Sequence, residues 1–136
     1  MKDDKTRQTY DEHAAVIAER FWGTELKQAW EAFLAALPAQ PHIIDIGCGP
    51  GRDVYHFIEK GASAFGLDYS SGLLGEAAKR GKQVFVQADM RALPLVANSF
   101  NGAWMSASLS LSRLDVASSS IKIRGSARIA LAIATR

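Results

Sequence analysis

The sequence predicts an α/β fold in which a mostly parallel, doubly wound sheet is built from strands that alternate with helices. Two observations predict it. Three short apolar runs each end in an aspartate, at Asp45, Asp68 and Asp89. The stretches between these runs have helical character, and both end in a basic residue followed by glycine, Lys60-Gly61 and Arg80-Gly81, which is typical of a helix end. Strands that alternate with helices form parallel sheets with right-handed connections.

Residues 1–40 are predicted to form the N-terminal helices of a single domain. Thr9 and Glu12 have the spacing of a capping box, which predicts a helix that begins at Thr9. An apolar stripe at helical spacing follows, made of Leu26, Trp30, Phe33 and Leu37. Pro38 and Pro41 end this helical region.

Residues 42–109 are predicted to form the core of the domain. Strands are expected over 42–46, 62–68, 83–89 and 100–106. The tail, 110–136, is divergent, but apolar residues in 128–135 alternate with alanine and predict a fifth strand. The predicted sheet is therefore incomplete, with about 4–5 strands.

Composition narrows the class of protein. The chain has 136 residues, 48% hydrophobic and 22% charged, as expected of one globular domain. Its net charge of +2 is too small to indicate binding of nucleic acid or of an anionic membrane. Its longest apolar run is far shorter than the ~20 residues that span a bilayer, and its one cysteine, Cys48, excludes an intrachain disulfide. We therefore expect a cytoplasmic protein.

A glycine-rich loop, Gly47-Cys48-Gly49-Pro50-Gly51, follows the first predicted strand. Glycines there allow a sharp turn and the close approach of a ligand, and the helix that follows offers free N–H groups to an anion. Asp68 ends the second strand, 21 residues after Gly47, where an acid can accept hydrogen bonds from both ribose hydroxyls. The spacing therefore predicts a cofactor that contains adenosine.

The loop differs from the dinucleotide fingerprint G-x-G-x-x-G. The third glycine of that pattern would fall at position 52, which is Arg52, and Asp45 lies two residues before the first glycine. An acid at that place is unfavourable for a pyrophosphate but suits a cofactor with an amino group. A nicotinamide-dependent oxidoreductase is therefore the disfavoured alternative.

Three segments resemble the motifs of one family. The run Ile43-Ile44-Asp45-Ile46-Gly47-Cys48-Gly49-Pro50-Gly51 is similar to the first motif of class I S-adenosylmethionine-dependent methyltransferases, which have a Rossmann-like fold. Gly66-Leu67-Asp68-Tyr69-Ser70 is similar to their second motif. Ala88-Asp89-Met90, with Leu93-Pro94 and Ser99-Phe100-Asn101-Gly102, resembles the region between the third and fourth strands in the small-molecule and ubiquinone-type branch.

The resemblance implies a role for each matching residue. The loop glycines Gly47, Gly49 and Gly51 would lie beside the methionine part of S-adenosylmethionine. Asp45 would hold its amino group, Asp68 would bind the ribose hydroxyls, and Tyr69 would lie against the adenine.

Four further residues carry over in the same way. Asp89 would accept a hydrogen bond from the adenine amine, with Met90 packed beside the ring. Ser106, at the end of the fourth strand, would lie near the reacting methyl group, and Tyr10 would close over the cofactor from the N-terminal helix. The resemblance implies a small-molecule acceptor and indicates no general base.

The chain departs from the family pattern in two places. Asn101 stands where relatives usually have aspartate, which we interpret as a structural difference at the start of a strand. The pattern also fades after about Leu109, so that no sequence remains for the last two of the family's seven strands. We therefore expect a truncated S-adenosylmethionine-dependent methyltransferase with little or no turnover in this short chain, and the alternative is a domain that binds cofactor but is inactive. We also expect self-association as a homodimer through an exposed sheet edge.

Overall fold

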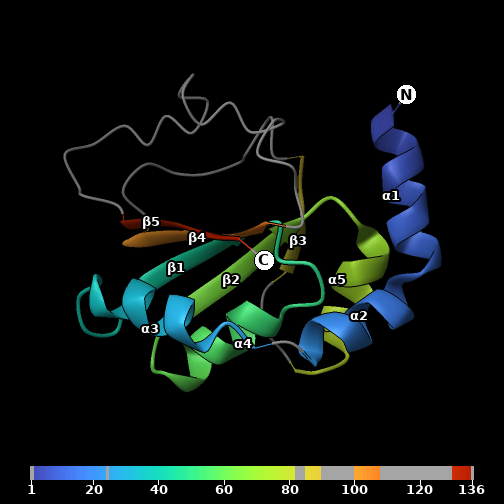
Figure 1. Ribbon diagram of the computed structural model, residues 1–136. Coiled ribbons are helices and arrows are strands. Elements are labelled where there is room, and N and C mark those ends of the chain that lie inside the picture. Colours follow the sequence, from blue (N-terminus) through green and yellow to red (C-terminus); the bar gives the residue numbers. More distant parts are fainter. Residues whose placement is uncertain (1, 24, 82–84, 90–99, 108–129, 136) are drawn as a thin grey trace.

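The computed structural model describes residues 2–23, 25–81, 85–89, 100–107 and 130–135 (Figure 1). The strands are β1 (His42–Ile46), β2 (Ser63–Asp68), β3 (Phe85–Gln87), β4 (Gly102–Ala107) and β5 (Ala130–Thr135). The helices are α1 (Lys2–Glu12), α2 (Ala14–Trp22), α3 (Lys27–Ala35), α4 (Arg52–Glu59) and α5 (Ser71–Ala78).

The five strands form one parallel sheet in the order β3-β2-β1-β4-β5. The chain moves outward from β1 to β3 in one direction and then restarts with β4 on the other side of β1, so that the strand order reverses between β1 and β4. This confirms the predicted Rossmann-like fold and its strands, including the fifth. The reversal matters for function because ligands of such sheets bind at the carboxyl ends of the strands beside it.

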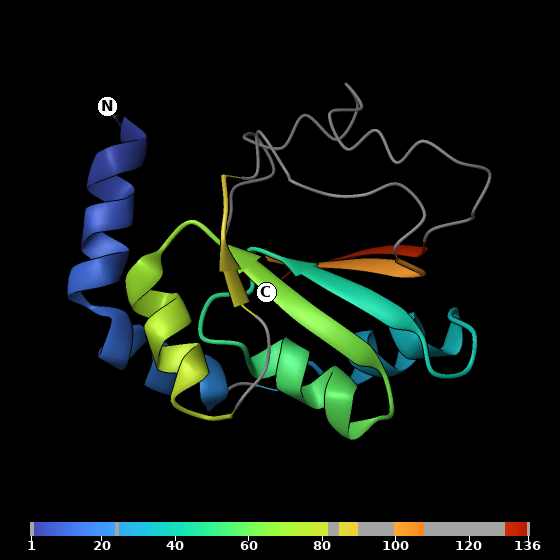
Figure 2. The ribbon, with the colours of Figure 1, turned by 180° about the vertical axis from the view of Figure 1, so that it is seen from behind.

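Helices α3, α4 and α5 lie on one side of the sheet, with α2 beside α5 and α1 standing at the margin (Figures 1 and 2). The expectation that helices cover both sheet faces concerns connections, 90–99 and 108–129, that lie outside the described residues. The edge position of β5 next to β4 agrees with the prediction of an outer fifth strand. Self-association through that edge stays a prediction.

The predicted capping box at Thr9 is wrong. Thr9 lies inside α1, which begins at Lys2, and its hydroxyl donates to the carbonyl of Lys5 at 2.9 Å. The helical region is interrupted at His13, whose ring nitrogen Nδ1 lies 3.0 Å from the carbonyl oxygen of Thr9. A threonine hydroxyl bonded one turn back is a common helix-interior arrangement. The same two residue types at the same spacing therefore occur in a helix without capping it.

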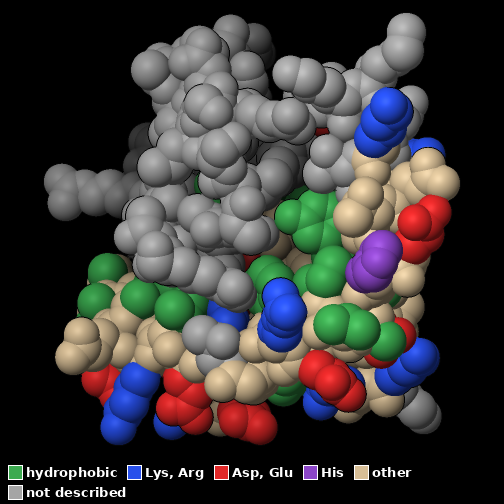
Figure 3. All heavy atoms as spheres, turned by 45° about the vertical axis from the view of Figure 1, so that its right-hand side comes forward, with side chains coloured by type: hydrophobic (Ala, Val, Ile, Leu, Met, Phe, Trp, Pro, Cys, Tyr) green, Lys and Arg blue, Asp and Glu red, His purple; other side chains and the backbone are tan. Residues whose placement is uncertain are grey.

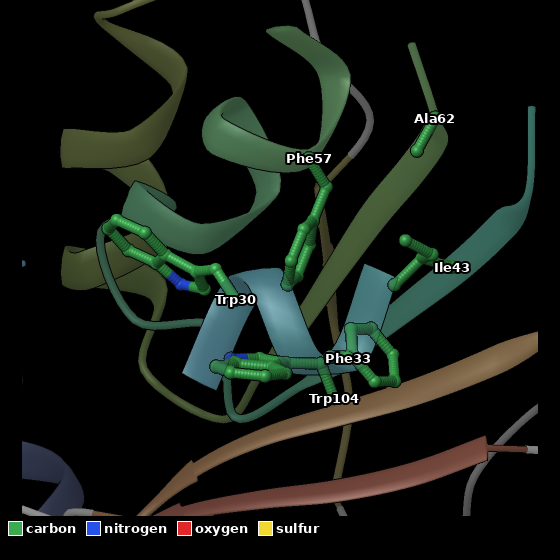
Figure 4. Packing of buried hydrophobic residues seen from close by; sticks show 6 residues of the cluster. All are labelled: Trp30, Phe33, Ile43, Phe57, Ala62 and Trp104. Atoms are coloured by element: carbon green, nitrogen blue, oxygen red, sulfur yellow. The ribbon is translucent and has the colours of Figure 1, made fainter. Parts of the chain in front are cut away.

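The larger hydrophobic cluster lies between the sheet and its helices (Figure 4). Its buried members are Trp30, Phe33, Ile43, Phe57, Ala62 and Trp104. The predicted apolar stripe of α3 supplies Trp30 and Phe33, with Leu26 and Leu37 at its border. A second cluster, on the other face of the sheet, contains Ile44, Ile46, Leu67, Ala103 and Met105. This alternation along β1 and β4 explains why apolar residues occupy both faces of these strands.

Asn101 confirms the interpretation of a structural substitution. Its side-chain oxygen accepts a hydrogen bond from the backbone N–H of His42 at 2.7 Å, and its own N–H donates to the carbonyl of His42 at 2.7 Å. An asparagine keeps the oxygen acceptor that aspartate would offer there. The start of β4 is thereby fastened to the start of β1.

A buried carboxylate joins three helices and a strand inside the larger cluster. Asp53, only 3% exposed, accepts hydrogen bonds from the indole N–H of Trp30 at 2.8 Å and of Trp104 at 3.0 Å. Arg52 donates to both of its oxygens, at 3.0 and 3.3 Å, and donates to the carbonyl of Phe21 at 3.2 Å. We call these residues the Asp53 network. Four of these hydrogen bonds are donated to the Asp53 carboxylate, a charge that burial would otherwise make unfavourable.

We expect Asp53→Asn to lower the free energy of unfolding by about 3 kcal/mol, because it removes one partner of a buried ion pair and leaves Arg52 without its counter-charge. Urea unfolding followed by circular dichroism measures the change. Glu59→Gln is the matched control, since Glu59 lies exposed on the same helix. Equal midpoints for the two variants would contradict the central role of the network.

Candidate cofactor-binding site

The glycine loop connects β1 to α4 through backbone conformations that favour glycine. Gly47, Gly49 and Gly51 have φ values of 73°, 55° and 85°, in the left-handed region. The N–H groups of Gly47 and Cys48 both donate to the carbonyl of Leu67 in β2, at 2.8 and 2.9 Å. The indole N–H of Trp22 donates to the carbonyl of Pro50 at 3.1 Å. These hydrogen bonds therefore fix the position of the loop relative to the ends of β1 and β2.

Two of these glycines serve different purposes. A Cβ at Gly51 would lie 2.9 Å from the ring of Phe85 and 3.1 Å from Cβ of Ala77, so Gly51 is needed for packing of α4 against α5 and β3. A Cβ at Gly49 would meet none of the described atoms within 4 Å. Although Gly49 is buried, the described residues leave the space at its Cβ position unfilled, which is what a loop that cradles a ligand requires.

Asp68, at the end of β2, lies beside the loop. One carboxylate oxygen accepts a hydrogen bond from the N–H of Gly49 at 2.8 Å, and the other accepts one from the N–H of Ser70 at 2.8 Å. Burial raises the pKa of Asp68 above its ordinary value, although these backbone donors oppose the shift. The carboxylate is still partly exposed, and each oxygen has a second lone pair to offer to a hydroxyl donor.

Asp45 lies one residue before the end of β1 and is fully buried, with 0% of its surface exposed. Among the described residues, neither of its carboxylate oxygens has a hydrogen-bond partner. Burial raises the pKa of Asp45 well above its ordinary value, and the negative charges of Asp53 and Asp68 add to the shift while Arg52 opposes it. A buried carboxyl group without partners costs about 1–3 kcal/mol, so its presence needs an explanation other than stability.

The segment after β2 and β3 places two further predicted residues at the same edge. Tyr69 follows Asp68, and the guanidinium of Arg7 lies 5.1 Å from the centre of its ring. Asp89 follows Ala88, whose N–H donates to the carbonyl of Asp68 at 2.9 Å. Asp89 is partly exposed. The structure therefore brings Asp45, Asp68 and Asp89 to neighbouring strand ends, as the sequence predicted.

The structure says less about the three remaining predicted site residues. Tyr10 lies in α1 and is partly exposed. Ser106 lies near the end of β4, where its backbone is paired in register with Ala134 of β5. Met90 lies outside the described residues. The roles of these three residues stay predictions.

Sequence reasoning missed the contact between α1 and the start of α5. The carboxylate of Asp11 accepts hydrogen bonds from the Ser70 hydroxyl at 2.6 Å and from the Gly72 N–H at 2.8 Å. Ser70 could be predicted as a helix N-cap, and it does accept from the N–H of Leu73 at 3.2 Å. No pattern in the sequence links it to Asp11, because the two residues are 59 positions apart.

A surface hollow of about 440 Å³ lies along α1 and is lined by Arg7, Gln8, Asp11 and Glu12. Figure 3 shows this side of the molecule, where hydrophobic side chains gather in the middle of the face with basic side chains beside them, and acidic side chains lie toward its lower and right-hand margins. Asp11 and Arg7 connect the hollow to Ser70 and Tyr69. The hollow therefore adjoins the strand-end site.

Comparison with known proteins agrees with this geometry. Residues 43–122, more than half of the chain, match the model of a family described as "Methyltransferase domain". The match begins in β1 and contains the glycine loop, Asp68 and Asp89.

Two curated relatives are malonyl-[acyl-carrier protein] O-methyltransferases. The one from Enterobacter lignolyticus is 33% identical over 81 residues, which cover 57% of this chain and 32% of the relative. The one from Pseudescherichia vulneris is 33% identical over 105 residues, which cover 74% of this chain and 38% of the relative. The matched part of the chain therefore spans about a third of the length of these relatives.

Solved structures lead to the same family. An S-adenosylmethionine-dependent methyltransferase from Mesorhizobium loti is similar with a TM-score of 0.54 and 36% identity, over 65% of this chain and 43% of that one. A second, from Methanosarcina mazei, has a TM-score of 0.61 and 25% identity, over 74% of this chain and 55% of that one. With the parallel sheet, the glycine loop and the strand-end aspartates in place, the chain belongs to the class I S-adenosylmethionine-dependent methyltransferases.

Proposed function

We propose that this chain binds S-adenosylmethionine at the carboxyl ends of β1, β2 and β3 and belongs to an enzyme that transfers its methyl group to a small-molecule acceptor. The observation that carries the proposal is the pair of carboxylates on either side of the glycine loop. Asp68 is partly exposed and bonded to the loop, whereas Asp45 is buried and without a partner among the described residues. The first suits ribose hydroxyls, and the second suits a cation.

The residues present fit the cofactor. A positive ligand group near Asp45 would add to the weak compensation that Arg52 gives this carboxyl group, which has no hydrogen-bond partner among the described residues, and the cofactor carries both an ammonium and a sulfonium group. The open space at Gly49 leaves room for a ligand against the loop backbone. Asp68 keeps lone pairs that point away from its two backbone donors.

The cofactor, when bound, supplies an electrophilic methyl group on a positively charged sulfur. The residues of this chain would then act by holding and orienting it: Asp68 at the ribose, Asp45 toward the amino end, and Tyr69 with Asp89 at the base. Orientation and exclusion of water are the main contributions that a protein makes to such a displacement. Met90, Ser106 and Tyr10 remain proposed contacts of the same site.

The acceptor is proposed from the relatives. Their printed names specify a malonyl group on an acyl-carrier protein, which suggests a carboxylate of a small acyl group as the methyl acceptor. A methyl-transfer assay with labelled S-adenosylmethionine tests this, with malonyl-acyl-carrier protein, a free malonyl thioester and an acetyl thioester as acceptors. Labelling of the malonyl compounds alone is expected, and labelling of none of them would contradict the proposed acceptor.

A second candidate function is cofactor binding without turnover. The observation that favours it is that the matched segment spans only about a third of the curated relatives. Calorimetry with S-adenosylhomocysteine beside the transfer assay separates the two candidates, because an inactive domain would bind and not transfer. Light scattering on the same sample tests the proposed homodimer through the β5 edge.

The part of the chain that the structure describes contains no helix long and apolar enough to cross a membrane. The one cysteine, Cys48, is buried and unpaired with another cysteine, and burial raises the pKa of its thiol well above the ordinary value, as do the nearby carboxylates of Asp45 and Asp68. An inert, reduced thiol supports the proposal of a cytoplasmic location.

We expect Asp68→Ala to weaken binding of S-adenosylhomocysteine by about tenfold to a hundredfold, since hydrogen bonds to a charged group contribute about 1.5–3 kcal/mol each. Calorimetric titration measures the dissociation constant. Glu59→Ala, an exposed acid on α4, is the control for the loss of one negative charge. Unchanged affinity in a folded Asp68→Ala protein would contradict the proposal that Asp68 binds the ribose hydroxyls.

We expect Gly49→Val to abolish binding because the branched side chain would fill the open space against the loop. The φ of 55° also makes any side chain there unfavourable, so the variant needs a control with the same backbone problem. Gly61→Val provides it: Gly61 has a φ of 91° and open space at its Cβ, but it lies at the far end of α4. Thermal unfolding and calorimetry should show that both variants lose stability and only Gly49→Val loses binding. Equal binding by both variants would show that the loop only connects β1 to α4 and does not contact the cofactor.

We expect Asp45→Asn to weaken cofactor binding and yet to stabilise the free protein by about 1–3 kcal/mol at neutral pH. Because the pKa of Asp45 is raised on folding, the folded state holds the proton more tightly, and stability falls as pH rises from the ordinary value of 3.8 toward the folded value. Asparagine does not titrate, so the difference between variant and parent should grow as the pH rises above the ordinary pKa of 3.8. Chemical unfolding at several pH values measures it, and a constant difference would show that Asp45 is already compensated.

A further inference from the structure

We propose that Asp11 is a positioning residue of the cofactor site, which fastens α1 to the segment after β2 and, through Ser70, fixes the carboxylate of Asp68. The inference rests on the proposed function, because it assigns Asp11 a role in binding the same cofactor. It concerns residues of α1 that lie outside the glycine loop and outside the three strand ends.

The contact itself is short and charged. A single oxygen of Asp11 accepts hydrogen bonds from the Ser70 hydroxyl at 2.6 Å and from the Gly72 N–H at 2.8 Å. Burial alone would raise the pKa of Asp11, but these two donors and the nearby charge of Arg7 hold it below the ordinary value. Asp11 is therefore ionised at neutral pH, and hydrogen bonds to an ionised acceptor are the strong ones.

Ser70 transmits the contact to the site. Its backbone N–H donates to one oxygen of Asp68 at 2.8 Å, while its hydroxyl oxygen accepts from the N–H of Leu73 at 3.2 Å. With its lone pair engaged by Leu73, the hydroxyl proton is directed to Asp11. The other oxygen of Asp68 holds the N–H of Gly49. One unbroken series of hydrogen bonds thus runs from α1 through Ser70 and Asp68 to the glycine loop.

A second contact from the same helix reaches the neighbouring residue. Arg7 lies four positions before Asp11, which places both on one face of α1. Its guanidinium lies 5.1 Å from the centre of the Tyr69 ring. The segment from Asp68 to Gly72 is therefore held by α1 at two points, one on either side of Ser70.

The approach of α1 depends on a missing side chain. A Cβ at Gly72 would lie 2.8 Å from Cα of Asp11 and 3.0 Å from its carbonyl oxygen, too close for α1 to remain where it is. A Cβ at Gly75, three residues later in α5, would meet none of the described atoms within 4 Å. The two glycines thus differ in whether α1 lies over them, which makes them a matched pair for an experiment.

The experiment compares Gly72→Ala with Gly75→Ala, and Asp11→Ala with Glu12→Ala, in the whole 136-residue chain. Glu12 is exposed, and its carboxylate accepts a hydrogen bond from Gln8 within α1. Two quantities are measured for each: the dissociation constant of S-adenosylhomocysteine by calorimetry, and the rate of tryptic cleavage after Lys5 and Arg7 in α1 without ligand. Asp11→Asn is added as the conservative variant, because its amide oxygen still accepts from Ser70 and Gly72.

We expect Gly72→Ala and Asp11→Ala to speed cleavage and to weaken binding by about tenfold, which is about 1.4 kcal/mol. Gly75→Ala and Glu12→Ala should change neither quantity, and Asp11→Asn should restore most of both. Faster cleavage with unchanged affinity would overturn the proposal, because it would make the contact purely structural, and so would unchanged values of both. If the unaltered chain fails to bind S-adenosylhomocysteine, the proposed function itself fails, which is seen before any substitution is made.

Discussion

The carboxylate of Asp53 is the point at which the helical layer and the sheet are joined. It takes up two indole N–H groups and the guanidinium of Arg52, and these donors come from α3, α4 and β4. A buried charge is tolerated only where such donors surround it, so α3 and β4 can pack on α4 only in one relative position. That position also fixes the first turn of α4, and therefore the end of the glycine loop from which α4 begins.

A second buried carboxyl group, that of Asp45, has the opposite hydrogen-bonding environment. Both aspartates are almost inaccessible, and they are close enough for the charge of Asp53 to raise the pKa of Asp45. The described residues satisfy Asp53 completely and leave Asp45 without a donor. The two aspartates therefore differ in hydrogen bonding: Asp53 stabilises the packing of the fold, whereas Asp45 is the group that we propose to lie near the cofactor. Buried groups that lower the stability of the fold are common at functional sites.

Much of the fold could be predicted because its signals are local. The strands with their aspartates, the helix ends with basic residues and glycine, and the glycine loop are each signalled within a few positions, and the structure has all of these elements. Their bounds differ from the prediction in places, since α5 ends at Ala78 rather than Arg80 and β3 covers only Phe85–Gln87. The alternation of apolar residues in the last segment was enough to predict β5. The capping box failed because Thr9 and Glu12 can satisfy their own helix without starting it.

What the sequence did not reveal depends on pairs of residues far apart in the chain. Asp53 and Trp104 are 51 positions apart, and Asp11 and Gly72 are 61 positions apart. Neither pair has a local pattern: an aspartate in the first turn of α4 is already favourable for that helix, and nothing near Asp11 in the sequence points to Gly72. Only the packed structure shows that these two acids reach beyond their own helices.

The three tryptophans give this chain an optical property that follows from where their indole nitrogens point. Trp30 and Trp104 both donate to one carboxylate in the core, and Trp30 is also stacked on His56 at 3.9 Å. Trp22 is only half-buried, donates to Pro50 of the glycine loop, and has the guanidinium of Arg80 4.1 Å from its ring centre. Trp30 and Trp104 therefore report on the interior of the protein, while Trp22 is hydrogen-bonded to the glycine loop. Because Trp22 is the most exposed of the three, we expect its emission at the longest wavelength, so that a change confined to that side of the spectrum would report movement of the loop within an intact fold.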